Sequence, residues 1–275
     1  MNIKNFFKSI KFRLSKKLDK KLNRKLNRWL RNFSFYPTIS MFFLKSKINY
    51  FVWNDIYFKN SNKNELINYK VGIVAVSHNR LDELKVFVQS IINQTNKNWS
   101  LHVIHDGKND EFLNIMDSYQ HQDPKRITYE CTNRRYNDYG HSLREIGLRK
   151  NCHEYTLITN CDNYYPPKTL EFINQAIKAS SFFRPDVVMF DMTHSHISAG
   201  GKKKSSYSFF DVFYKRNYID IGSAIVDTKL AQKVGFVDKS FAADATYFED
   251  ILKEKNKEGL KLNVVKIPRV LLVHN

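Results

Sequence analysis

Polar side chains that could bind a cation and a phosphate gather in one short stretch, residues 155–167. An apolar, β-branched run over 155–159 predicts a buried strand, and Asn160 and Asp162 follow directly. Being two residues apart, they point the same way in an extended chain. Oxygen ligands on one side suit a hard cation such as Mg²⁺ or Mn²⁺ that also holds a phosphate. The alternative interpretation is an ordinary strand end followed by a Pro-Pro turn.

Alternating strand and helix patterns surround this stretch. Strands are expected over 71–76, 99–104, 126–131, 155–159 and 186–192, and helices over 81–95, 111–119, 142–150 and 170–179. Such alternation with short connections predicts an α/β fold with a mostly parallel central sheet covered on both faces. Ligands bind outside the carboxyl ends of the strands in open sheets of this kind, which is where Asn160 and Asp162 lie. Two more strands are expected, over 219–226 and 270–273.

The positive charge is concentrated at the N-terminus. Residues 1–70 hold 17 Lys and Arg against 3 Asp and Glu, whereas the remaining residues hold 28 against 24. Apolar residues recur at steps of three or four along residues 7–33, which predicts a basic amphipathic helix suited to an anionic membrane surface. Packing within the protein or an oligomer, or binding to nucleic acid, are the alternatives. No recognised nucleic-acid-binding module accompanies the helix, so nucleic acid is the weaker of the two.

These patterns divide the chain into residues 1–44 as the basic amphipathic segment, 45–69 as a connector and 70–275 as the main domain. No stretch is long and apolar enough to span a bilayer, and no cleavage pattern of a signal peptide follows the charged start. The three cysteines show neither a disulfide-type pattern nor the spacing of a zinc site, which predicts a reducing compartment. The expectation is therefore a cytoplasmic protein held peripherally at the inner face of the membrane.

Four polar segments follow predicted strand ends or lie just beyond them. They are residues 77–80 (Ser-His-Asn-Arg), 105–107 (His-Asp-Gly), 160–163 (Asn-Cys-Asp-Asn) and 273–275 (Val-His-Asn). In this order they resemble the inverting GT-A glycosyltransferases of family 2, which use nucleotide-diphosphate sugars. Segment 105–107 is similar to that family's Asp-Asp-Gly and segment 160–162 to its Asp-x-Asp, each with the first Asp replaced. The resemblance covers residues 70–275 and implies a GT-A domain.

The resemblance implies a nucleotide-sugar site. In it, Asp106 would accept a hydrogen bond from the imide N–H of a uracil-type base. A plain turn at a strand end is the alternative for Asp106, and a surface position the alternative for Arg80. The residues that the resemblance assigns to nucleotide-sugar binding are Ser77, His78, Asn79, Arg80, Asp106, Gly140, Arg144, Asn160 and Cys161.

The resemblance also implies a divalent metal, Mn²⁺ or Mg²⁺, bridging the diphosphate. Asp162 would ligate it, and the cation would stabilise the nucleotide diphosphate as it leaves. His274 would complete the metal shell, and its imidazole suits Mn²⁺ better than Mg²⁺. A solvent-exposed histidine near the chain end is the other interpretation.

An inverting transfer needs a base that deprotonates the acceptor hydroxyl. The resemblance assigns that role to Asp244, although Ala243 replaces the Glu that precedes it in the family. A helix-capping role is the alternative for Asp244, with Glu249 and Asp250 as other bases. The segment 219–226 is placed on the acceptor side, with Asp220, Gly222 and Ser223 as its residues.

The expected function is metal-assisted transfer of a sugar from a nucleotide-diphosphate donor, with UDP favoured, to a surface-glycan or lipid-linked acceptor. The replaced residues at 105, 160 and 243 keep a second hypothesis open, a silent relative that binds a sugar nucleotide or a glycan. The third hypothesis is a nucleic-acid-binding protein that uses the basic amphipathic segment, the basic arm.

Overall fold

The computed structural model describes residues 68–180, 184–195 and 207–275. The expected helix within residues 1–44 and nearly all of the connector 45–69 lie outside these residues. None of the helices in the described ranges is long and apolar enough to cross a membrane.

Eight strands form one sheet within the described residues. They are β1 (Val71–Ser77), β2 (Trp99–His105), β3 (Ile127–Cys131), β4 (Tyr155–Asn160), β5 (Val187–Ser195), β6 (Tyr207–Phe210), β7 (Ala224–Asp227) and β8 (Val264–His274). The order is β3-β2-β1-β4-β7-β5-β6, and β8 also pairs with β5. Neighbours among β3, β2, β1 and β4 are parallel, as are β5 and β8, whereas β6 and β7 are antiparallel to their partners. The predicted α/β fold with a mostly parallel core is confirmed.

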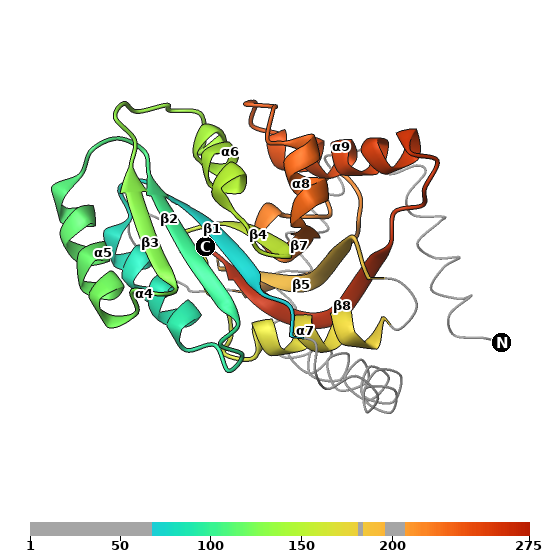
Figure 1. Cartoon of the computed structure of the whole chain (residues 1–275), viewed down its shortest axis with the longest axis horizontal. Helices are drawn as coiled ribbons and strands as arrows, with labels where there is room; N and C mark the ends of the chain where they lie inside the picture. Colours follow the sequence, from blue (N-terminus) through green and yellow to red (C-terminus); the bar gives the residue numbers. More distant parts are fainter. Residues whose placement is uncertain (1–67, 181–183, 196–206) are drawn as a thin grey trace, which may run out of the picture. The chain divides into compact units, whose positions relative to one another are not determined.

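Helices cover both faces of the sheet (Figure 1). One face carries α4 (Leu81–Ile92), α5 (Asp110–Gln122) and α7 (Thr169–Ala179), and the other carries α6 (His141–Lys150), α8 (Thr228–Val234) and α9 (Ala243–Lys257). Because β1 is buried along its whole length, its sequence is a continuous apolar run rather than an alternating one. Gly147 lets α6 lie directly on β1, since a Cβ there would stand 2.3 Å from a methyl group of Val74.

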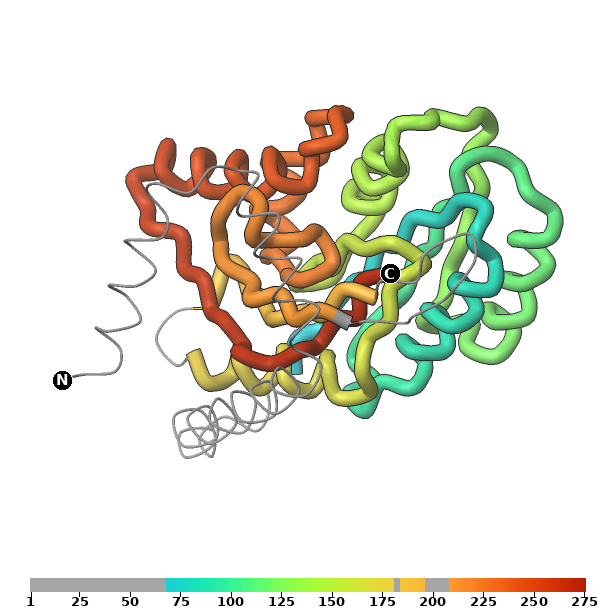
Figure 2. The backbone as a smooth tube through the Cα atoms, turned by 180° about the vertical axis from the view of Figure 1, so that it is seen from behind, coloured from blue at the N-terminus to red at the C-terminus, as the bar shows by residue number. Residues whose placement is uncertain are grey.

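The parallel pairing brings the ends of several strands to one edge of the sheet. β1 ends at Ser77, β2 at His105 and β4 at Asn160, and the C-terminal strand β8 ends at His274. The last strand is tied to the segment after β4 by paired backbone hydrogen bonds between Tyr164 and Val273 (2.9 and 3.0 Å). Figure 2 shows the end of β8 reaching this yellow-green segment. The tie carries His274 to the edge of the sheet where the other polar strand ends lie.

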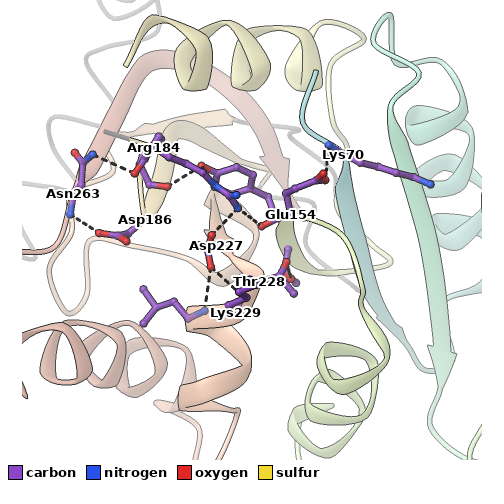
Figure 3. Close-up of polar contacts among 12 residues, drawn as sticks. Lys70, Glu154, Arg184, Asp186, Asp227, Thr228, Lys229 and Asn263 are labelled. Atoms are coloured by element: carbon purple, nitrogen blue, oxygen red, sulfur yellow. Dashed lines mark hydrogen bonds and ion pairs between the residues drawn. The ribbon is translucent and has the colours of Figure 1, made fainter. Parts of the chain in front are cut away.

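A network of hydrogen bonds fastens the opposite edge of the sheet (Figure 3). Arg184 donates to the carbonyl of Glu154 (2.8 Å) and to Asp227 (2.6 Å), whose other oxygen caps α8 by accepting from the backbone N–H of Lys229 and Leu230. Glu154 in turn accepts from the N–H of Lys70 at the start of β1 (3.0 Å). These contacts join β1, β4, β7 and α8 far from the polar strand ends.

The continuous strand expected over 219–226 is wrong. A 3₁₀ turn, Ile221–Ser223, comes first, and the antiparallel strand β7 begins at Ala224. The turn forms because Asp220 accepts from the N–H of Gly222 (2.8 Å) while Ser223 donates to the carbonyl of Asp220 (2.7 Å). Such local side-chain bonds compete with strand pairing, and the apolar pattern does not reveal them.

Candidate active site

A cleft of about 710 Å³ lies at the edge of the sheet where the polar strand ends meet. It is bounded by the ends of β1, β2, β4 and β8, by the loop before α6 and by the start of α9. Its lining residues are Val76, Ser77, His78, Arg80, Asp106, Arg135, Asn137, Tyr139, Gly140, His141, Leu143, Arg144, Asn160, Cys161, Asp162, Asp220, Phe241, Asp244 and His274. Segments nearly 200 residues apart in the chain therefore share one cavity.

Arg144 connects three other side chains that line this cleft. Arg144 is only 3% exposed, and its guanidinium donates to Asp244 (2.9 Å), to Asn160 (2.8 Å) and to Nδ1 of His141 (2.7 Å). Burial, aided by the neighbouring Arg144 charge, lowers the pKa of His141 to about 4. The imidazole is therefore neutral near pH 7 and can accept the hydrogen bond. One buried cation thus fixes three side chains from β4, α6 and α9.

Asp244 lies in the first turn of α9, where the helix N-terminus favours negative charge. Burial raises the pKa of its carboxyl above the ordinary value, while the positive charge of Arg144 opposes the rise. A raised pKa brings a carboxylate nearer to the value at which it accepts protons efficiently near neutral pH. Its neighbourhood suits a general base better than a simple helix cap.

Asp162 has one oxygen engaged and one without a partner. Arg80 donates to Oδ2 at 2.6 Å, whereas the buried Oδ1 has no hydrogen-bond partner among the described residues. Burial raises the pKa of this carboxyl, and the charges of Arg80 and His274 oppose the rise. An unsatisfied buried carboxylate oxygen is costly and calls for a bound group.

The donor set at this point fits a divalent cation shared with a diphosphate. Asp162 supplies a free carboxylate oxygen, and His274 supplies an imidazole whose Nε2 lies 3.4 Å from Asp220. Among the described residues, no group of three or more His, Cys, Asp or Glu side chains is arranged to hold a metal by itself. Phosphate oxygens and water would have to complete the shell, as is common for Mg²⁺.

Asp106 is anchored to the loop that precedes α6. Its carboxylate accepts from the backbone N–H of Tyr136 (2.7 Å) and Asn137 (3.1 Å), and Arg135 lies 3.9 Å away. A carboxylate has about four lone-pair positions, so capacity for one more donor remains. His105, which takes the place of the family's first Asp, instead bonds the Gly107 carbonyl (2.8 Å) and packs on Phe112. Burial lowers the pKa of His105, so this position carries no charge near pH 7.

Most residues expected from the sequence line the cleft. Five do not line it: Asn79 is exposed, and Gly222 and Ser223 are buried. The alternative bases Glu249 and Asp250 instead pair with Arg216 and Lys253 outside the cleft. Gly222 lies against the Tyr165 hydroxyl, which donates to its carbonyl at 2.9 Å. Of the acceptor-side residues, Asp220 alone lines the cleft, and Cys161 lines it as a buried thiol whose pKa is raised by burial. Arg144 contacts protein side chains rather than facing the cavity freely.

Arg135, His141 and Phe241 are among the seven lining residues that were not expected from the sequence. The first two lie on the loop held by Asp106 and at the start of α6, and no periodic pattern marks them. Phe241 was detectable in principle, because it is a large aromatic residue in a polar segment that leads into the helix of Asp244. Its exposure, 85%, is visible only in the structure.

Comparisons with known proteins agree with this geometry. Two solved structures show the same fold. A 1–349 fragment of TarS from S. aureus matches with a TM-score of 0.57 and 16% identity, over 75% of this chain and 60% of that one. The mannosyltransferase PcManGT from Pyrobaculum calidifontis, solved with GDP-Man and Mn²⁺, matches with a TM-score of 0.54 and 12% identity, over 86% of this chain and 66% of that one.

The TarS fragment has also been solved with UDP and with UDP-GlcNAc. This chain spans about a third of the longer TarS structure. No curated protein sequence matches the chain. The sequence model of glycosyl transferase family 2, however, matches residues 72–227, more than half of the chain. With the α/β sheet and the cleft at its strand ends, this match establishes that the chain belongs to glycosyl transferase family 2.

Proposed function

We propose that this protein transfers a sugar, with inversion, from a nucleotide-diphosphate donor to a glycan or lipid-linked acceptor. One observation carries the proposal: two half-buried carboxylates, Asp162 and Asp244, line the same cleft, and burial raises the pKa of each. A metal-binding carboxylate and a separate basic carboxylate are what an inverting displacement on a sugar diphosphate requires.

The chemistry divides between the two carboxylates. Asp244 would take the proton of the acceptor hydroxyl as that oxygen forms its bond to the anomeric carbon. The bond from that carbon to the diphosphate oxygen breaks, and the nucleotide diphosphate leaves with the electron pair. Asp162 and His274 would hold a divalent cation, which when bound neutralises charge on the diphosphate. Arg144 keeps Asp244 in place by the 2.9 Å ion pair.

The donor base is assigned to the Asp106 end of the cleft. Ser77 and His78 line the cavity beside Asp106, whose carboxylate retains capacity to accept the imide N–H of uracil. UDP is accordingly the favoured nucleotide. TarS has been solved with UDP and PcManGT with GDP-Man, so both nucleotides need to be tested.

The test is a mass-spectrometric screen of UDP- and GDP-sugars for consumption with Mn²⁺, with Mg²⁺ and with chelator. The wild type should release one nucleotide diphosphate in a metal-dependent way. Asp244→Asn should lower turnover by about 10²- to 10⁴-fold and leave UDP affinity within about twofold. Asp162→Ala should weaken metal-dependent UDP binding about tenfold or more.

Asp227→Asn is the matched control, because Asp227 caps α8 and pairs with Arg184 away from the cleft. It should keep both properties. Wild-type turnover in Asp162→Ala and Asp244→Asn would refute the assignment of roles. Metal-dependent UDP binding without consumption of any donor would instead favour a silent relative, for which the neutral Asn160 and Ala243 are the supporting residues.

A further inference from the structure

Two aromatic side chains stand exposed on the rim of the cleft. Tyr139 is 67% exposed and Phe241 is 85% exposed, although both line the cavity. Their rings meet edge to face, with centroids 5.7 Å apart and an interplanar angle of 78°. A pair of exposed aromatic rings beside a cleft offers apolar faces that a ligand can cover.

The backbone holds Tyr139 in an unusual conformation. Its φ is +59°, a left-handed value that is rare and strained for a bulky residue. Hydrogen bonds hold the loop both before and after Tyr139 in the chain. Asp106 binds the N–H groups of Tyr136 and Asn137, and Asp138 accepts from Ser142 at the start of α6 (3.0 Å). Strain that persists because its surroundings enforce it clusters at ligand-binding sites.

Phe241 is placed by the turn that opens α9. The side chain of Asp238 accepts from the N–H of Ser240 (2.8 Å), and the carbonyl of Ser240 accepts from the N–H of Ala243 (3.0 Å). Asp244 follows Phe241 by three residues and lines the same cleft. The exposed ring pair therefore stands next to the residue proposed as the base.

A pyranose ring matches this combination of groups. Its C–H groups form apolar patches on the two faces of the ring, and its hydroxyls project around the rim. An aromatic face can bury a C–H patch while a nearby carboxylate accepts from a rim hydroxyl. The donor nucleotide is assigned to the part of the cleft near Asp106 and Asp162. A sugar that reaches Asp244 from the rim is therefore the acceptor, whose hydroxyl must lose a proton in the reaction.

We propose that Tyr139 and Phe241 form an acceptor subsite, an aromatic platform on which a pyranose ring of the acceptor stacks with one hydroxyl directed at Asp244. The subsite rests on the proposed glycosyl transfer and names the chemical class of the acceptor, a glycan whose terminal residue is a pyranose. It also assigns binding roles to two residues outside the donor and metal sites.

Saturation-transfer NMR on the full chain tests the platform, with UDP and Mn²⁺ present and with methyl pyranosides of glucose, galactose, mannose and N-acetylglucosamine as probes. At least one probe should receive most saturation on the C–H protons of one ring face. Tyr139→Ala and Phe241→Ala should each weaken its binding about tenfold, whereas Tyr139→Phe and Phe241→Tyr should retain it. UDP affinity, measured by calorimetry, should stay within about twofold.

Phe213→Ala is the matched control. Phe213 is 45% exposed and also meets another aromatic ring, Tyr218, edge to face at 6.1 Å, but it does not line the cleft. Its removal should leave pyranoside binding unchanged. Circular dichroism of each variant establishes that the fold is retained.

Several outcomes would overturn the proposal. One is that no pyranoside gives a signal on the wild type at millimolar concentration. Another is that the wild type and both alanine variants bind the pyranoside equally. A third is that the alanine variants lose UDP affinity in parallel, which would place the rings in the donor site. If the two alanine variants lose binding to phosphatidylglycerol vesicles but keep pyranoside binding, the two rings contact lipid instead. If neither UDP nor GDP binds the wild type while pyranosides still bind in a ring-dependent way, the proposed glycosyl transfer fails, and the two rings remain a pyranose-binding site without an acceptor role.

Discussion

At the scale of single residues, the cleft depends on one buried cation that serves three partners. Arg144 binds Asp244, Asn160 and His141, and each partner comes from a different element. The amide at position 160 fits this arrangement. A second carboxylate there would share the guanidinium with Asp244 and weaken its hold on the proposed base. The neutral Asn160 therefore has a physical reason in this chain, although it departs from the family's Asp-x-Asp.

Replacing Arg144 should shift the pH dependence of turnover. In Arg144→Gln the positive charge that lowers the pKa of Asp244 is gone, and burial together with Asp220 raises that pKa further. The base is active when deprotonated, so the acid limb of log kcat should move to higher pH. Arg144→Lys should retain most of the wild-type profile, because the charge remains.

Measurements of kcat and donor KM from pH 5 to 9 check this prediction. Near pH 6, kcat should fall about 10- to 100-fold while donor KM changes less, since Arg144 acts through Asp244. Removing one partner of a buried pair also costs about 3–5 kcal/mol of stability, so urea unfolding must accompany the kinetics. An unchanged acid limb in a folded Arg144→Gln would contradict the positioning role.

At the scale of elements, the site is assembled by close packing of α6 on the sheet. Arg144 reaches Asn160 on β4 because α6 lies directly against β1, with Gly147 at the contact. A glycine in a helix interior ordinarily costs about 1 kcal/mol relative to alanine, so its presence here is explained by the contact rather than by helix propensity.

Gly147→Ala should therefore destabilise the fold by about 1–3 kcal/mol, despite alanine's better helix propensity. The added Cβ would stand 2.3 Å from Val74 and 3.1 Å from Ile104, so the helix must move outward. Urea unfolding gives the magnitude, and turnover should fall as Arg144 moves with α6. In a Val74→Ala background the obstructing methyls are absent, and the same change should cost clearly less. Equal costs in both backgrounds would rule out the steric explanation.

At the scale of the whole molecule, the charge is divided between an arm and a nearly neutral domain. Residues 1–35 carry 12 Lys and Arg, whereas residues 71–275 balance 28 basic against 24 acidic side chains. A lipid-linked acceptor and a basic arm would place donor chemistry at an anionic membrane surface. That location remains a proposal about residues outside those the structure describes.

Deleting residues 1–35 should abolish sedimentation with phosphatidylglycerol vesicles and leave donor consumption in solution within about twofold. Two matched variants separate charge from apolar contact. Replacing Lys16, Lys17 and Lys21 by Gln should weaken vesicle binding at least tenfold, in a salt-dependent way, because each basic residue contributes about 1 kcal/mol near such a surface. Replacing Leu14, Leu18 and Leu22 by Ser should weaken binding at all salt concentrations.

If the full chain binds duplex DNA but not vesicles, and deleting residues 1–35 removes the DNA binding, the membrane proposal is contradicted and nucleic-acid binding is favoured. Equal vesicle binding by the full chain and the deleted chain would remove the arm from any role in membrane attachment.

The amino-acid sequence by itself determined the succession of strands and helices, because apolar periodicity and turn residues are local properties. The run from Val71 to Ser77 is a strand at almost the bounds expected, and Asn160 and Asp162 do follow a buried strand. The order of polar segments at strand ends was enough to predict a shared edge, since parallel pairing brings those ends together. The expected strand over 219–226 failed because the hydrogen bonds of Asp220 and Ser223 form a 3₁₀ turn that apolar spacing does not report.

Which side chains meet depends on how distant segments pack together. Asp244 lies 100 residues after Arg144, and no pattern in the sequence links them, yet they form an ion pair in the cleft. In the same way, Tyr139 and Phe241 become a pair only when the loop held by Asp106 and the turn before α9 come to one rim. Partners and burial depend on contacts between distant segments, and these contacts set pKa values and exposed surfaces that residue types alone do not specify.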